Sequence, residues 1–189
     1  MDKLPILATQ NLCLKLPSVD AAASVRDYFY RNRQHLAPTM PIFDDELFQV
    51  EFWKTKLAAN IDEFRDGRAL RLFLFHASDT NHVIGSCNFT EIIRGVYQGC
   101  FLGYGIDEKF QSQGLMTEAL GEAIKFVFGP MNLHKIDANY LPSNTASGRV
   151  LNKLGFEKMG LARQELYLTG EWRDHVAMRL INVDWAPTP

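Results

Sequence analysis

The chain has 189 residues, the size of a single domain, and is long enough to bury a hydrophobic core without disulfides or metal ions. Its 47% apolar and 22% charged residues are typical of a soluble globular protein and exclude a disordered chain. A formal net charge of −2 argues against a general nucleic-acid binder, and no apolar run reaches the length of a membrane span.

The first half of the chain is predicted to place two helices between its first two strands. Apolar residues at every third or fourth position indicate helices, whereas alternation or a short apolar run indicates strands. Prolines at 38 and 41 predict a loop between the two helices. The expected elements are a strand at 11–16, a helix at 21–30, a loop at 36–41, a helix through 48–64 capped by Asp44 or Asp45, a central strand at 69–75, a turn at 77–81 and a strand at 83–90.

The second half is predicted to alternate strands with helices. The expected elements are a hairpin loop at 94–99, a strand at 101–106, a helix at 115–128, a strand at 136–140, a helix that Asn144 caps and Gly155 ends, and strands at 161–168 and 172–181 joined by Thr169-Gly170. No repeat, low-complexity segment or linker interrupts this order. We therefore expect one domain over residues 1–189.

Cysteine usage and the N-terminal segment bear on metal binding and location. Cys13, Cys87 and Cys100 show neither paired nor metal-ligand spacing, and no cluster of His, Cys or carboxylate residues shows such spacing. We predict reduced, packed thiols and no metal. Residues 1–5 lack the apolar region of a signal peptide, so the expected location is the cytoplasm.

The segment 107–118 is the one on which the functional prediction depends. It joins an apolar strand to a helix, and the first N–H groups of such a helix converge where an anion can sit. Gly114 lacks a Cβ, so a phosphate could approach the main chain closely. The segment is neither a Walker loop nor a dinucleotide fingerprint. An ordinary strand-to-helix turn would use the same residues, so this segment alone leaves both interpretations open.

A resemblance favours the phosphate site. Gln111-x-x-Gly114-x-Met116 resembles the Gln/Arg-x-x-Gly-x-Gly/Ala signature of the GCN5-related N-acetyltransferases (GNAT), in which this loop binds the pyrophosphate of acetyl-CoA through backbone amides. Met116 departs from the signature, and its side chain could crowd the phosphates. The resemblance implies acetyl-CoA as cofactor, with contacts from Gly105, Ile106, Gln111, Ser112, Gln113, Gly114, Leu115, Met116 and Thr117.

A second segment, 139–156, resembles the Asn-x-x-Ser…Leu-x-Lys-x-Gly-Phe block of the ribosomal-protein acetyltransferase branch of that family. The resemblance implies that Asn144 contacts coenzyme A and that Ser147 lies near the cofactor sulfur, where its hydroxyl could protonate the leaving thiolate. From the residues alone, Asn144 would equally be a plain helix N-cap for the amide of Ser147, and Lys153 a cation placed favourably near a helix end.

The predicted element order is that of the GNAT fold. This resemblance implies an α/β (α+β) class with a mixed, mostly antiparallel sheet in which the fourth and fifth strands splay apart around acetyl-CoA. Segments 90–95, 114–120 and 171–175 resemble members of the branch that acetylate the N-terminal alanine of a small-subunit ribosomal protein. The implied partner is the N-terminus of a ribosomal protein, as peptide or assembled particle, without nucleic-acid specificity. A monomer or weak dimer is expected.

Direct transfer from a thioester to an amine needs few groups. The thioester oxygen needs a hydrogen-bond donor, and in the family a free backbone N–H on the strand around residues 103–106 supplies it. Candidate catalytic side chains are Ser147, Glu91 and Tyr104. Glu91 could equally be a solvated carboxylate at a loop edge, and Tyr104 a packed aromatic. His35 and His76 are predicted to be isolated, and His134 to lie at the surface outside any motif. Neighbouring Asp174 and His175 are predicted to face opposite sides of a strand.

Two other functions stay open. The chain could acetylate a small amine such as a polyamine or an antibiotic, which an anionic acceptor site would favour. It could also be a coenzyme A-binding module that associates with ribosomal partners without turnover, which binding without transfer would favour.

Overall fold

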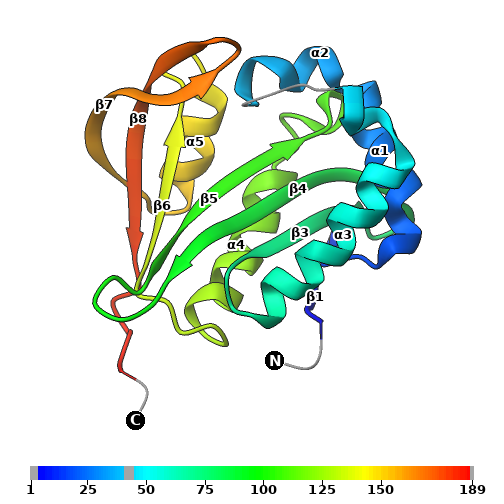
Figure 1. Cartoon of the computed structure of the whole chain (residues 1–189). Coiled ribbons are helices and arrows are strands. Elements are labelled where there is room, and N and C mark those ends of the chain that lie inside the picture. The colour runs from blue at the N-terminus through cyan, green and yellow to red at the C-terminus, as the bar shows by residue number, and fades with distance from the viewer. Residues whose placement is uncertain (1–3, 41–44, 188–189) are drawn as a thin grey trace.

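The protein, seen in a computed structural model that describes residues 4–40 and 45–187, is built on one eight-stranded sheet (Figure 1). The strands lie in the order β1-β2-β3-β4-β5-β6-β8-β7, and each neighbouring pair is antiparallel except β5 and β6. They are β1 (Ile6–Ala8), β2 (Leu12–Lys15), β3 (Leu70–His76), β4 (Asp79–Ile93), β5 (Gly99–Ile106), β6 (Lys135–Tyr140), β7 (Glu157–Leu168) and β8 (Glu171–Ile181).

Helices cover both faces of this sheet (Figure 1). They are α1 (Ala22–Arg31), α2 (Arg33–Leu36), α3 (Val50–Arg65), α4 (Leu115–Phe128) and α5 (Thr145–Lys153), with short 3-10 helices η1 (Val19–Ala21), η2 (Ala37–Thr39), η3 (Asp45–Phe48) and η4 (Glu108–Phe110). Helices α1 and α3 enclose one core with the sheet, and α4 and α5 the other. No helix within the described residues is long and apolar enough to cross a bilayer.

Strand β3 shows why the sheet separates two cores. Leu70, Leu72 and Leu74 pack in the core under α4, whereas Phe73 and Phe75 pack against α1 and α3. Alternate side chains of a strand point to opposite faces, so a strand with helices on both sides is apolar throughout. This burial confirms the central strand predicted at 69–75.

The N-terminal third contains one strand that was not predicted and two predictions that are wrong. Strand β1 was not predicted, because three residues carry too little periodicity to indicate a strand. Residues 36–41 were predicted as loop, but α2 and η2 occupy the positions up to Thr39, and Pro38 is tolerated because it lies in the first turn of η2. Asp45 begins η3 instead of capping the long helix, which starts at Val50 without a side-chain cap. Asp44 and Pro41 lie outside the described residues.

The rest of the chain follows the predicted order, with β4, β7 and β8 extending beyond the predicted strands. Asn144 caps α5 by accepting the N–H of Ser147 at 3.1 Å, and Gly155 adopts a left-handed φ of +85° where the helix stops. Thr169 and Gly170 both have positive φ, as a two-residue hairpin turn requires.

Strands β5 and β6 separate partway along their length. Their parallel ladder ends at Leu102 and Ala138, yet β5 continues beside β4 to Ile106 and β6 continues beside β8 to Tyr140. Figure 1 shows the two strands diverging towards the end of the sheet that α2 and the β7–β8 hairpin border. This separation confirms the splayed sheet expected from the resemblance, and it leaves one edge of β5 unpaired beyond Leu102.

Candidate active site

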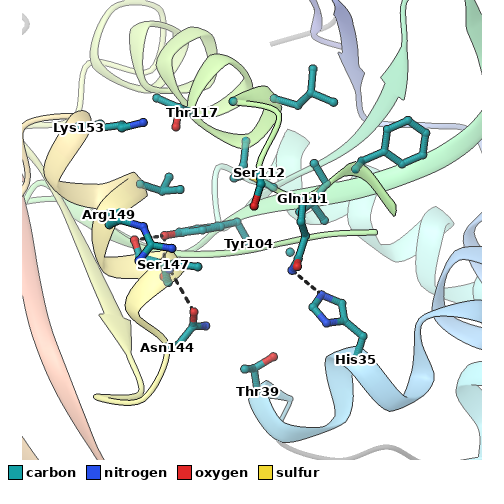
Figure 2. A pocket seen from close by; sticks show the side chains of 18 of the residues that line it. His35, Thr39, Tyr104, Gln111, Ser112, Thr117, Asn144, Ser147, Arg149 and Lys153 are labelled. Atoms are coloured by element: carbon teal, nitrogen blue, oxygen red, sulfur yellow. Dashed lines mark hydrogen bonds between the residues drawn. The ribbon is translucent and has the colours of Figure 1, made fainter. Parts of the chain in front are cut away.

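A cavity of about 410 Å³ lies where residues 107–114 lead into α4, and we call it the loop cavity (Figure 2). It is walled by β5, the start of α4, α5 and the α2–η2 segment. Gln113 does not line it, because its exposed side-chain amide donates to the carbonyl oxygen of Lys109 at 3.0 Å. All the other residues predicted to bind cofactor do: Gly105, Ile106, Gln111, Ser112, Gly114, Leu115, Met116, Thr117, Asn144 and Ser147.

The start of α4 has the features of an anion site. Gly114 is its N-cap with φ +79°, and a Cβ placed there would meet no atom within 4 Å. The first-turn amides of a helix have no acceptor within the helix, so they can bind an anion in the cavity. The side chain of Met116 is only 6% exposed and packs in the core beneath α4. It therefore leaves the loop uncrowded, contrary to what its departure from the signature suggested.

Two cations of α5 also line the loop cavity. Figure 2 shows Lys153 directed from α5 towards the start of α4. Arg149 stands one turn earlier, and its guanidinium donates to the hydroxyl of Thr145 at 3.2 Å. Sequence reasoning gave Lys153 only a role at the helix end and missed Arg149. The four-residue spacing of two cations facing one loop is the signal that could have found both.

Tyr104 and Ser147 meet across the gap between β5 and α5. Their hydroxyl oxygens lie 2.7 Å apart, and the tyrosine hydroxyl is also 3.1 Å from the carbonyl oxygen of Ser147. Burial raises the pKa of Tyr104 to about 12, whereas the hydrogen bond with Ser147 acts in the opposite direction. Tyr104 therefore stays protonated at neutral pH, and the pair can pass a proton from one hydroxyl to the other.

A second cavity, of about 580 Å³, lies on the other side of this pair, and we call it the hairpin cavity because β7 and β8 border it. Leu36, Thr39, Tyr104, Gly105, Asn144 and Ser147 line both cavities. The two cavities therefore share a boundary at the point where β5 and β6 have separated.

Two irregularities of the sheet bring carboxylates to the hairpin cavity. Glu91 has φ +50°, lies at the register shift between β4 and β5, and lines the hairpin cavity. Glu165 follows Gln164, which also has positive φ and donates its N–H to Asp174 at 2.8 Å within the β7 bulge. Bulges re-aim side chains in this way. Glu165 accepts a hydrogen bond from Asn139 at 3.2 Å and was not predicted.

His175, on β8, is another unpredicted residue of the hairpin cavity. It is 3% exposed, and its Nδ1 lies 3.0 Å from the carbonyl oxygen of Arg173. A carbonyl only accepts, so Nδ1 carries the proton and a neutral ring would have its lone pair on Nε2.

Two histidines predicted to be isolated have neighbours. His35, on α2, lines the loop cavity, and its Nε2 lies 2.9 Å from the side-chain amide nitrogen of Gln111 (Figure 2). The Nδ1 of His76 lies 2.7 Å from the hydroxyl oxygen of Ser78. His134, predicted at the surface, is half-buried, and its ring centroid lies 5.5 Å from that of Trp185. The partners of His35 and His134 are distant in sequence, so local spacing could not indicate them.

Helix α1 is fastened to the start of the loop. Arg31 pairs with the buried carboxylate of Asp107 at 2.5 Å and also donates to the carbonyl oxygen of Val83. The side chain of Asn32 accepts the N–H of Glu108 at 3.0 Å. Helices that border the hairpin cavity are thereby held to the loop that forms the other cavity.

Comparison with known proteins agrees with this geometry. Residues 12–157 match the model of the acetyltransferase (GNAT) domain. The chain is 40% identical to the [Ribosomal protein uS5]-alanine N-acetyltransferase of Escherichia coli K12, over 96% of this chain and 93% of that protein. It is 33% identical to the probable N-acetyltransferase YjcK of Bacillus subtilis, over 81% and 84% of the two chains.

Solved structures show the same fold. The ribosomal-protein-S5-alanine acetyltransferase of Vibrio fischeri matches with a TM-score of 0.92 and 32% identity, over 97% of this chain and all of that one. Mycobacterium smegmatis RimJ, in complex with CoA-disulfide, matches in fold with a TM-score of 0.85 at 24% identity, over 94% and 86%. The loop, the free edge of β5 and the α5 cations suit a phosphorylated thioester donor, and the chain belongs to the GNAT acetyltransferase family, whose acetyl donor is acetyl-CoA.

Proposed function

We propose that this chain transfers an acetyl group from acetyl-CoA to the N-terminal α-amino group of a ribosomal protein, with an N-terminal alanine of a small-subunit protein as its acceptor. The observation that carries the proposal is the Tyr104–Ser147 pair at the boundary of two cavities. One cavity suits an anionic donor, and the other is open to an acceptor. The relatives from E. coli and V. fischeri, both named for alanine acetylation, support the choice of acceptor.

The loop cavity is proposed to hold the donor. The first-turn amides of α4, with Gly114, Ser112 and Thr117 around them, bind the pyrophosphate, and Arg149 and Lys153 add positive charge. Asn144 keeps the start of α5 in place through its bond to Ser147. When bound, acetyl-CoA supplies an activated acyl carbon and a thiolate leaving group.

The residues at the boundary are proposed to stabilise the charges that develop. An N–H on the unpaired edge of β5, near Gly105, donates to the thioester oxygen. Ser147 donates a proton to the departing sulfur and recovers one from solvent through Tyr104, which ends protonated. The raised pKa of Tyr104 keeps this pair protonated until the sulfur leaves.

The hairpin cavity is proposed to receive the acceptor. An α-ammonium has a pKa of about 8, so a useful fraction is already neutral at physiological pH and only modest help is needed to deprotonate it. Glu91 and Glu165 attract the cationic form, and Glu91 takes its proton directly or through water. We propose that the protein acts as a monomer or weak dimer, in the cytoplasm, where such a substrate would be met.

The test is thiol release from acetyl-CoA with three acceptors: a peptide that starts with alanine, the same peptide with its N-terminus blocked, and spermidine. We expect release with the first alone and, by mass spectrometry, acetylation at the α-nitrogen. Release with spermidine alone would assign a small-amine acetyltransferase, which the two carboxylates also suit. Cofactor binding without release to any acceptor would indicate a binding module.

A further inference from the structure

Tyr28, on α1, carries a hydroxyl that none of the steps above uses. Its side chain is 1% exposed but lines the hairpin cavity, and among the described residues its hydroxyl has no hydrogen-bond partner. The oxygen is not one of the fully enclosed polar atoms that lack a partner, so it can be reached from the cavity. A hydroxyl that faces a cavity and has no partner in the described protein can donate to or accept from a ligand bound there.

The hydroxyl lies beside the unpaired edge of β5. A Cβ built on Gly105 would be 3.3 Å from the Tyr28 oxygen, and Gly105 lines both cavities. It also lies beyond Leu102, where β5 has lost contact with β6. The Tyr28 oxygen is thus at the boundary where donor and acceptor must meet, on the side of the hairpin cavity.

The surroundings of Tyr28 hold this position. The main-chain and side-chain amides of Asn32 both donate to the Tyr28 carbonyl oxygen, at 3.2 and 2.9 Å. The Arg31 guanidinium, paired with Asp107, lies 5.7 Å from the centroid of the Tyr28 ring. The same contacts that fasten α1 to the loop therefore fix the tyrosine before a substrate arrives, which lowers the cost of binding it.

Tyr28 keeps its proton under physiological conditions. Burial, and then the negative charge of Asp107, raise the pKa of the Tyr28 hydroxyl well above its ordinary value, although Arg31 acts in the opposite direction. A hydroxyl that stays neutral cannot take the proton of the acceptor, but its oxygen can accept a hydrogen bond.

We propose that the Tyr28 hydroxyl binds the acceptor amine, accepting a hydrogen bond from its N–H and so directing the nitrogen lone pair at the thioester carbon. This inference rests on the proposed function and adds an acceptor-binding group to it. In the step, the N–C bond forms, the C–S bond breaks, the sulfur takes the proton of Ser147, and the proton that the nitrogen loses leaves to Glu91 or water. Tyr28 neither gains nor loses a proton.

The test compares Tyr28→Phe with Tyr30→Phe as a matched control. Tyr30 lies on the same helix, is 53% exposed and lines neither cavity. With the alanine peptide we expect Tyr28→Phe to lower kcat/KM about tenfold, the loss of one hydrogen bond that matters in the transition state. The KM for acetyl-CoA should stay within about twofold and the pH midpoints of kcat/KM should not move. Tyr30→Phe should behave as the unaltered chain.

A second variant keeps the test decisive if Tyr28→Phe folds poorly. The methyl of Gly105→Ala would lie 3.3 Å from the Tyr28 oxygen and shield it while leaving the Gly105 N–H in place, so we expect a similar loss of kcat/KM with the KM for acetyl-CoA within about twofold of its original value. Unchanged kcat/KM in either folded variant would overturn the inference, as would a change confined to the KM for acetyl-CoA. If the unaltered chain acetylates the peptide and the variants match it, only this inference fails; if it acetylates no acceptor, the proposed function fails too.

Discussion

The two cavities differ in how the chain builds them. The loop cavity takes its anion site from one continuous stretch, 111–117, and from successive turns of α5. The hairpin cavity takes Tyr28, Glu91, Asn139, Glu165 and His175 from five separate elements. A site made of main-chain amides depends on local conformation and leaves a recognisable motif, whereas a site made of side chains from distant elements leaves none. The donor site of such an enzyme can therefore be predicted from the sequence, whereas the acceptor site needs the structure.

The largest expected effect lies where the cavities meet. Ser147→Ala removes the proton donor for the sulfur, so we expect kcat to fall about 100-fold, within the range for general acid catalysis, with little change in either KM. Steady-state kinetics with the alanine peptide measure it. Ser143→Ala is the matched control, because Ser143 is exposed and precedes the same helix. An equal loss in both variants would show that α5 is merely disturbed.

The next effect should be confined to the loop cavity. Gly114→Val places a β-branched residue at φ +79°, which strains the start of α4 and puts a side chain over its amides. We expect the KM for acetyl-CoA to rise about tenfold while the KM for peptide changes little. Gly95→Val provides the control, because Gly95 also has positive φ and open space but lines neither cavity. A matching rise in both variants would contradict a phosphate site at Gly114.

A smaller effect should be confined to the hairpin cavity. Glu165→Gln keeps the hydrogen bond with Asn139 possible but removes a negative charge that faces the acceptor. We expect the KM for the alanine peptide to rise about threefold to fivefold, because screening limits a single charge at an open cavity. Glu157→Gln, exposed on the same strand, should have no effect. A peptide KM unaffected by Glu165→Gln would remove this carboxylate from the acceptor site.

The smallest effect concerns the connection between the two regions. Burial alone would raise the pKa of Asp107, but hydrogen bonds from Arg31 and other neighbours hold it below its ordinary value of 3.8. A carboxyl group whose pKa is lower in the folded state stabilises the fold at pH values above its unfolded-state pKa. This stabilisation is lost as the pH falls through the folded-state pKa. We expect Asp107→Asn to lower the free energy of unfolding by about 1–2 kcal/mol at pH 7. This value allows for solvent screening of the ion pair, because the Arg31 side chain is a third exposed.

Urea unfolding of both proteins between pH 7 and pH 3 measures this difference. The gap in unfolding free energy should stay constant down to about pH 4 and shrink below it. A gap that widens on acidification would contradict the depressed pKa.

The sequence predicted the loop cavity well and the hairpin cavity poorly. Apolar periodicity placed α4 and the central strand, because local spacing determines which face is buried. The motif residues 111–117, Asn144 and Ser147 were placed largely through resemblance, and the structure brings all of them but Gln113 to the loop cavity. Glu165 and His175 could not be found, since a β-bulge turns one and the register of β6 and β8 places the other. Tyr28 has the sequence spacing of an ordinary core residue, because its ring packs in the core and only its hydroxyl faces the cavity.

The most direct test of the central claim is a crystal structure with a bisubstrate ligand, an alanine-starting peptide joined through its α-nitrogen and an acetyl bridge to the sulfur of coenzyme A. We expect the pyrophosphate to lie against residues 111–117, the bridge beside Tyr104 and Ser147, and the peptide in the hairpin cavity near Tyr28. A peptide that leaves through the loop cavity, or a bridge away from Ser147, would contradict it.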